Sequence, residues 1–157
     1  MPGKHGPNRL GNYLHVHESC MADFLEEGFV VQDDCGFTFL PGVVVLEGPI
    51  ICLDGVTLDV RKEIEILGGS GMNAWVQTRS FRYHAWVRGS HNILRYESAH
   101  ERHRERAHKH VYDTFGYGGE ADVIELPTED ETPTLGDVLS ELRGWHLMNA
   151  RRLRDLP

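Results

Sequence analysis

Hydrophobic and polar residues alternate through the middle of the chain, and this pattern predicts β-strands. Between positions 58 and 66, the aliphatic residues Leu58, Val60, Ile64 and Ile66 share one side of an extended strand, and the charged residues Asp59, Arg61, Glu63 and Glu65 share the other. The segment 43–52 is rich in β-branched residues, and 74–88 is the longest strand candidate. A Gly-Ser turn at 89–90 leads into a further strand. Such short turns predict an antiparallel sheet of about four to six strands.

An N-terminal helix is expected before this sheet. Its apolar residues fall at helical spacing between Ser19, which can cap the start, and Gly28, which can end the helix. These apolar residues are Met21, Phe24 and Leu25. The preceding residues 1–18 begin with a stretch rich in Gly, Pro and Asn, so we expect a flexible N-terminal segment.

A second helix is expected near the other end of the chain. Thr134 and Asp137 have the spacing of a capping box variant, and an amphipathic pattern follows over 134–154. An apolar stripe of this kind covers one face of a sheet. The sequence therefore predicts a single α+β domain over 19–157, with an N-terminal and a C-terminal helix packed on the sheet.

Strand parity divides the residues of 74–88 into two faces. The odd positions are mostly large and apolar and indicate a core face, whereas the even positions hold polar residues beside a tryptophan. These even positions are Arg82, His84, Trp86 and Arg88. In the next strand Leu94 and Tyr96 share one face, and Arg95 and Glu97 point the opposite way. Whether Arg82 and Arg95 lie on the same side of the sheet depends on the strand register.

The formal charge of −8 argues against a protein that coats nucleic acid, since such binding rests on a cationic surface. The charge is unevenly distributed, however. Residues 79–110 hold half of all Lys and Arg in about a fifth of the chain, and residues 113–141 hold nine acids and neither Lys nor Arg. One face can therefore present a positive potential to a ligand despite the overall charge.

The sequence predicts a cytoplasmic protein without a membrane segment. Its longest apolar run, Val43 to Leu46, is far too short to span a bilayer. The N-terminus has no apolar region of the kind that secretion signals contain. Three cysteines without a CxxC pair favour reduced thiols that pack in the core.

The segment "YESAHERHRERAHKHVY", residues 96–112, contains four histidines, three arginines and a lysine. We expect a loop over 98–106 and then a strand that places His108 and His110 on one face. Three interpretations follow from this composition. The histidines bind a metal ion, or histidines and arginines cleave a phosphodiester without metal, or the segment is a solvated charged loop.

Phosphodiester cleavage suits this composition best. An imidazole can take a proton from a 2′-hydroxyl, a second can protonate the leaving oxygen, and guanidinium groups match phosphate geometry. This chemistry needs no cofactor. The candidate catalytic residues are His84, His100, His108, His110, Arg95 and Tyr96, and the candidate substrate-binding residues are Arg82, Arg102 and Lys109.

The order of several segments resembles the TumE-type toxin family of toxin–antitoxin modules. These segments are "FRYHAWV", "ILRYESAH", "HKHVYD" and "TLGDVLSELRGW", within 43–145. The family's "YxYH" motif matches Phe81, Tyr83 and His84; its "RYDNAPHH" segment matches Arg95, Tyr96, Ala99 and His100; its final "HKH" matches His108, Lys109 and His110. Glu97 and Ser98 stand where the family has Asp and Asn, and the first forty residues have no counterpart.

The resemblance implies a growth-inhibiting toxin that cleaves RNA and is neutralised by a helix-turn-helix antitoxin. Two other functions stay open at this point. One is a metal-dependent hydrolase that uses the histidines, and the other is a non-catalytic module that binds a protein through its C-terminal helix. The sequence also leaves open whether the chain forms a homo-oligomer.

Overall fold

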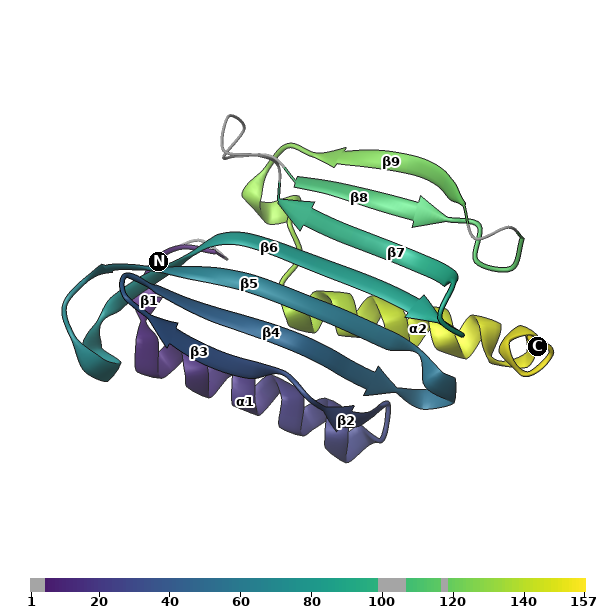
Figure 1. Cartoon of the computed structure of the whole chain (residues 1–157), viewed down its shortest axis with the longest axis horizontal. Helices are drawn as coiled ribbons and strands as arrows, with labels where there is room; N and C mark the ends of the chain where they lie inside the picture. Colours follow the sequence, from purple (N-terminus) through teal and green to yellow (C-terminus); the bar gives the residue numbers. More distant parts are fainter. Residues whose placement is uncertain (1–4, 99–106, 117–118) are drawn as a thin grey trace.

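The alternating segments of the sequence form the long central strands of one antiparallel sheet (Figure 1). A computed structural model describes residues 5–98, 107–116 and 119–157 of the chain. The central strands are β4 (Val43–Cys52), β5 (Thr57–Gly68), β6 (Trp75–Val87) and β7 (His91–Ser98). Each pairs with the next along the chain, as expected when short turns join the strands.

Five shorter strands extend this centre to nine strands, in the order β2-β4-β5-β6-β7-β8-β9, with β1 beside β6 and β3 beside β4. They are β1 (Asn8–Arg9), β2 (Val30–Asp33), β3 (Gly36–Leu40), β8 (Ala107–Tyr112) and β9 (Glu120–Leu126). The α+β class is confirmed, but the expected count of about four to six strands is wrong. The additional strands are short or lie at the sheet edges, where polar residues weaken the alternating pattern.

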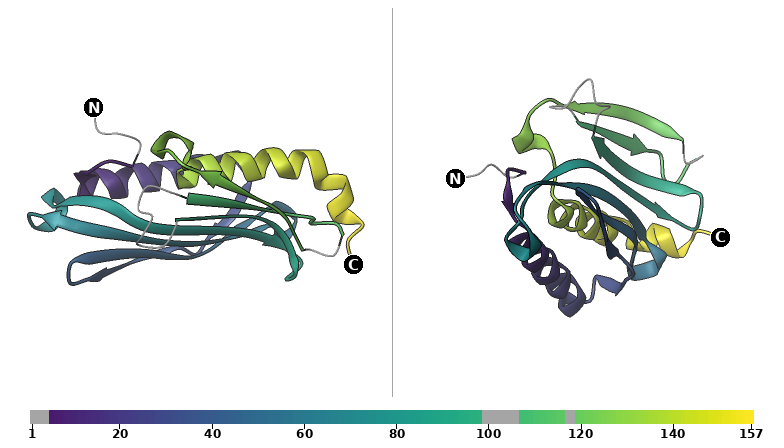
Figure 2. Two further views of the ribbon diagram at one scale, coloured as in Figure 1. Left: turned by 90° about the horizontal axis from the view of Figure 1, so that it is seen from above. Right: turned by 60° about the vertical axis from the view of Figure 1, so that its left-hand side comes forward.

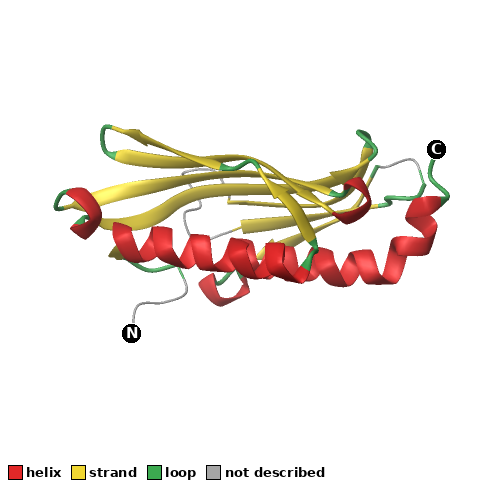
Figure 3. Ribbon diagram, turned by 90° about the horizontal axis from the view of Figure 1, so that it is seen from below, coloured by secondary structure: helices red, strands yellow, loops and turns green. Residues whose placement is uncertain are grey.

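Two helices pack on the same face of the sheet, which curves around α2 (Figure 2). They are α1 (Leu10–Glu27) and α2 (Leu135–Arg154). The short turns η1 (Leu53–Gly55), η2 (Gly71–Asn73) and η4 (Glu129–Glu131) connect other elements. Figure 3 shows both helices below the strands, with no described helix on the other side. We call the helix side the covered face and the other side the open face.

The hydrophobic core lies between the sheet and the helices. Its largest fully buried side chains include Tyr83, Leu46, Ile50, Leu58, Leu139 and Leu142. The prediction that β5 has one apolar and one charged face is confirmed. Its even-numbered aliphatic residues point into the core, and its odd-numbered charged residues point to the open face. Burial of apolar surface therefore determines which face of each strand packs against the helices. The side chains on the opposite side of each strand then form the open face.

The N-terminal helix begins at Leu10 and not at Ser19, so residues 10–18 form its first half instead of a flexible segment. Leu10 is buried, and Tyr13 and Leu14 pack against a small apolar cluster around Ile64. This contact stabilises a helical turn whose Gly11 and Asn12 have poor intrinsic helix propensity. The expected end at Gly28 is confirmed, with this glycine in the left-handed conformation at φ 85°.

The predicted faces of β6 are correct in its second half and reversed in its first. Residues 81–87 alternate as expected, with odd positions buried. The register with β5 shifts by one residue between the pairs Glu63–Ser80 and Ile64–Thr78. Because such a bulge switches the side-chain parity, Val76 is buried and Trp75 is exposed. Arg9 packs over the Trp75 ring, with its guanidinium carbon 3.9 Å from the centroid.

The C-terminal helix is confirmed as an amphipathic helix that begins with a capping box. The Thr134 hydroxyl accepts a hydrogen bond from the Asp137 backbone N–H, and the Asp137 carboxylate accepts one from the Thr134 N–H. The first half of α2 lies beside the second half of α1: Gly136 is next to Cys20, and Arg143 forms an ion pair with Glu27. The two helices therefore run side by side over the covered face.

Candidate functional site

Two rows of charged and imidazole side chains cross the open face. In the first row, His84 of β6 pairs with Arg95 of β7, which pairs with His110 of β8. Neighbouring strands are about 4.8 Å apart, so the two histidines stand about 10 Å apart at the backbone with the arginine between them. The strand register thus places two imidazoles on either side of one guanidinium. We call this set the His84–Arg95–His110 row.

The second row lies beside the first and supplies further charge. Arg82 pairs with Glu97, which pairs with His108. Arg82 and Arg95 therefore lie on the same face of the sheet, which the sequence alone left undecided. Apart from this backbone pairing, the side chains of Arg82 and His108 make no hydrogen bond or ion pair within the described part of the chain. Both side chains are available to a ligand on this face.

His110 is held between two carboxylates. Its Nδ1 lies 2.6 Å from Glu120 Oε2, and its Nε2 lies 2.9 Å from Glu97 Oε1. Carboxylates only accept hydrogen bonds, so the ring makes both bonds when both of its nitrogens carry protons. In the form that carries both protons, the ring can donate one of them to a leaving group.

His84 has a different set of contacts. Its Nε2 lies 2.8 Å from Asn92 Oδ1, and its ring centroid is 6.3 Å from that of Tyr112. Because an amide oxygen accepts a hydrogen bond, this contact places the ring proton on Nε2 and leaves Nδ1 with a free lone pair. In this tautomer, Nδ1 of His84 can accept a proton from a ligand on the open face.

Arg95 lies between the two histidines and keeps an unused donor. Its Nε is buried and donates no hydrogen bond among the described residues; Glu97 Oε2 is 3.6 Å away. A buried donor that makes no hydrogen bond costs free energy even beside a carboxylate, and an anion bound to this guanidinium could accept that bond. The guanidinium therefore marks the centre of a candidate anion site.

A shallow hollow of about 280 Å³ adjoins the row on the open face. Strands β4, β5 and β6 line it, and Arg82 and His84 form one side. Of the acids on the other side, Asp59 accepts a hydrogen bond from Trp86 Nε1 at 2.8 Å, and Glu47 pairs with Arg61. Arg61, the other cation of the hollow, is paired with Glu47 and Glu63, so Arg82 is the cation that this hollow offers to a ligand.

Two predicted site residues lie on the covered face and are separated from the row. The Tyr96 hydroxyl donates to Glu141 Oε2 at 2.9 Å, and Lys109 forms an ion pair with the same carboxylate. The Lys109 ammonium also lies over the Tyr96 ring. Burial raises the pKa of Tyr96, and the Glu141 charge raises it further, so the phenol stays protonated. These contacts attach β7 and β8 to α2 and point away from a ligand on the open face.

The remaining predicted residues, His100 and Arg102, lie outside the described residues. Three further residues contact the row but were not among the residues predicted from the sequence: Glu97, Glu120 and Asn92. Strand parity could have indicated Glu97, which shares a face with Arg95. Glu120 belongs to β9, which the sequence pattern did not predict, and Asn92 reaches His84 through the geometry of the β6–β7 hairpin.

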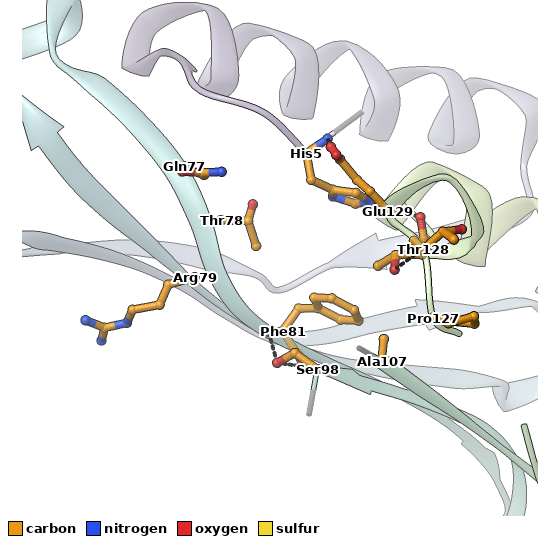
Figure 4. A pocket seen from close by; sticks show the side chains of 11 residues that line it. His5, Gln77, Thr78, Arg79, Phe81, Ser98, Ala107, Pro127, Thr128 and Glu129 are labelled. Atoms are coloured by element: carbon orange, nitrogen blue, oxygen red, sulfur yellow. Dashed lines mark hydrogen bonds between the residues drawn. The ribbon is translucent and has the colours of Figure 1, made fainter. Parts of the chain in front are cut away.

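A separate cavity of about 470 Å³ lies on the covered side, between β6 and η4 (Figure 4). None of the predicted site residues lines it. His5 and Glu129 meet at one side of the cavity, where the His5 backbone N–H donates to Glu129 Oε1 at 2.7 Å. Phe81 and Ser98 form another side. This cavity is distinct from the row and brings no catalytic pair together.

Among the described residues, no group of three or more His, Cys, Asp and Glu side chains is arranged to hold a metal ion. Neither described helix has both the length and the apolar character that crossing a membrane requires. No family model, curated protein or solved structure matches the chain.

Proposed function

We propose that the protein is a metal-independent endoribonuclease whose active site is the His84–Arg95–His110 row. One observation carries the proposal: a histidine with a free lone pair and a doubly hydrogen-bonded histidine lie on either side of an arginine with a buried, unused donor. Metal-independent RNA cleavage needs a base, an acid and a phosphate-binding cation in this arrangement.

Each group has a definite role in the reaction. His84 Nδ1 takes the proton of a ribose 2′-hydroxyl, and the 2′-oxygen attacks the adjacent phosphorus. The bond from phosphorus to the 5′-oxygen breaks, and the His110 imidazolium gives a proton to that oxygen. Arg95 binds the phosphate between the two imidazoles and stabilises the negative charge of the transition state. The products are a 2′,3′-cyclic phosphate and a free 5′-hydroxyl.

The second row supports binding of the substrate. Arg82 lines the hollow and its side chain makes no hydrogen bond or ion pair among the described residues, so it can bind the phosphate of a neighbouring nucleotide. Glu97 and Glu120 hold the His110 ring in place through contacts with both of its nitrogens. The many acids elsewhere on the chain disfavour nonspecific binding along nucleic acid. We therefore expect short-range recognition of a few nucleotides.

An RNA cleavage assay in excess chelator tests the proposal. Wild-type protein should cleave a short RNA, and His84→Ala and His110→Ala should each lower the rate about 10²- to 10⁴-fold. His15→Ala, an exposed histidine on α1, is the matched control and should cleave at the wild-type rate. A substrate with deoxyribose at the cleavage site should resist, because it lacks the nucleophile. Full activity of both row variants, or a requirement for metal, would contradict the mechanism.

The proposed biological role is that of a toxin in a toxin–antitoxin module, supported by the resemblance of the "FRYHAWV" and "HKHVYD" segments. RNA is then the substrate, and a helix-turn-helix antitoxin is the protein partner. Induction of the wild-type gene should arrest growth with RNA breakdown, and the double variant His84→Ala/His110→Ala should grow normally. Arrest by both proteins with intact RNA would contradict a toxin that acts through this site.

A second candidate function is a binding module that acts through α2. Leu147 and Met148 are adjacent and 74% and 87% exposed, which is unusual for large apolar side chains. In that case a Leu147→Asp/Met148→Asp variant should lose function while the histidine variants keep it. The ribonuclease proposal predicts the reverse for RNA cleavage in vitro.

A further inference from the structure

A second cavity on the covered side, of about 320 Å³, lies between α1, the start of α2 and the sheet. Residues 5–8 close one side of it, and side chains of α1 form the opposite wall. Lys62 of β5 lines the cavity, and none of the described lining residues is an aspartate or a glutamate. A cavity of this size falls at the lower end of the range for small-molecule sites.

Lys62 is a cation without an acidic partner in this part of the molecule. Its ammonium lies 4.9 Å from the centroid of the Tyr13 ring and interacts with the hydroxyls of Tyr13 and Tyr83. No ion pair joins it to a carboxylate among the described residues. Burial by itself lowers the pKa of Lys62, but the two tyrosine hydroxyls outweigh burial and raise it overall, so the ammonium stays charged. A largely buried charge of this kind costs free energy until an anion accompanies it.

The other polar groups of the cavity suit an anion as well. The Tyr13 hydroxyl and Thr78 Oγ1 lie 3.4 Å apart on the wall, and either can donate to a bound oxygen. The start of α2, at Leu135 and Gly136, opens onto the cavity. Backbone N–H groups in the first turn of a helix have no partner within the helix and attract negative charge. The Asp137 carboxylate accepts the Thr134 N–H and does not line the cavity.

Apolar groups complete the lining. Val16 and Leu135 contribute aliphatic surface, and the Tyr13 ring contributes an aromatic face. The neighbouring cavity of about 470 Å³ shares His5 and Thr78 with this one, but Glu129 lines it and makes it less suitable for an anion. One ammonium beside apolar walls matches a monoanion that carries a short hydrocarbon part.

We propose that this cavity binds a small organic acid, with its carboxylate on Lys62 and its apolar part against Val16 and Leu135. The carboxylate provides the counter-charge that Lys62 lacks and accepts hydrogen bonds from the hydroxyls of the wall. The site lies on the covered face, apart from the His84–Arg95–His110 row, and does not depend on the proposed ribonuclease activity.

Titration of the full chain with benzoate, followed by isothermal calorimetry, tests this site. Benzoate should bind the wild-type protein with one-to-one stoichiometry, and Lys62→Met should weaken binding at least about tenfold, as expected for the loss of a charged hydrogen bond. Arg61→Met is the matched control: it removes a cation from the adjacent position of β5 on the opposite face. This variant should bind like the wild type.

A second variant keeps the test decisive if Lys62→Met does not fold. Val16 is 62% exposed, so Val16→Trp should fold normally while its larger side chain obstructs the cavity. We expect benzoate binding to be lost in this variant although Lys62 is intact. No binding to the wild type would overturn the proposal, and so would equal binding by the wild type, Lys62→Met and Val16→Trp.

Discussion

The two faces of the sheet carry similar side chains but use them differently, as the neighbours Lys109 and His110 of β8 illustrate. Lys109 points to the covered face, where Glu141 of α2 pairs with it and the Tyr96 ring lies beneath it. His110 points to the open face beside Arg95, whose Nε makes no hydrogen bond among the described residues and lies 3.6 Å from Glu97 Oε2. Charged side chains on the covered face therefore connect elements of the fold, whereas the charged side chains of the row can still bind a ligand.

The largest effect on stability should come from the core of the covered face. Leu139 is fully buried, so Leu139→Ala should lower the free energy of unfolding by about 2–5 kcal/mol, measured by urea denaturation. Leu147→Ala in the same helix is the control, and its exposed side chain should change stability by less than about 0.5 kcal/mol. Equal losses in the two variants would contradict the assignment of the covered face.

A smaller effect is expected where a charge connects β8 to α2. Lys109→Met should lower the free energy of unfolding by about 1–3 kcal/mol, because Glu141 loses its partner in a partly buried setting. RNA cleavage should persist, in contrast to His110→Ala. A Lys109→Met variant with normal stability and lost cleavage would show that Lys109 contacts the substrate, as the sequence suggested.

Acid should lower the free energy of unfolding through His17 of α1. Burial lowers the pKa of His17, and Lys62 acts in the same direction, against the charges of Asp33 and Glu18. The His17 ring of the folded chain then binds a proton less readily than that of the unfolded chain. The contribution of His17 to the free energy of unfolding is therefore fully present above pH 6.5, the ordinary pKa of histidine, and is lost as the pH falls below this value.

Thermal unfolding between pH 7.5 and pH 5 measures this dependence. His17→Gln should reduce the slope of unfolding free energy against pH, whereas His15→Gln, two residues away and exposed, should leave it unchanged. The same slope in the wild type and in His17→Gln would contradict the role given to His17.

The smallest effect is expected for an ion pair on the open face. Arg61 and Glu47 approach to 2.6 Å, but their side chains are 46% and 54% exposed. Arg61→Ala should therefore cost about 0.2–1 kcal/mol at low salt, and the difference should vanish at about 1 M salt. A larger loss that persists in salt would show that the open face contributes to stability as the covered face does.

The sequence predicted the central sheet and α2 because their patterns are set by burial on one side. The pattern in β6 was reliable only beyond the bulge at Arg79, since a register shift leaves no clear mark in residue types. The first half of α1 has buried or half-buried residues at Leu10, Tyr13 and His17, a helical spacing that Gly11 and Asn12 obscure. β9 is exposed along nearly all its length, so it carries no hydrophobic alternation.

The candidate site was predicted in part. Parity within each strand separates Arg95 from Tyr96 and His110 from Lys109, but the register of β7 with β8 is what places Arg95 beside His110. The sequence could not align Arg95 with His84, because that pairing depends on the length of the β6–β7 turn and on a register shift after Ala85. Partners from distant segments, such as the carboxylate of Glu120, follow only from the three-dimensional pairing of the strands.

The position of β9 at the end of the sheet has a consequence for how the protein behaves at high concentration. An edge strand presents unpaired backbone groups that another chain can bind, and Val123 and Ile124 are exposed along this one. Glu120, Asp122 and Glu125 surround them with negative charge. Copies of the chain that approach edge to edge at neutral pH therefore repel one another, and acid that neutralises these carboxylates should promote aggregation before it exposes the core.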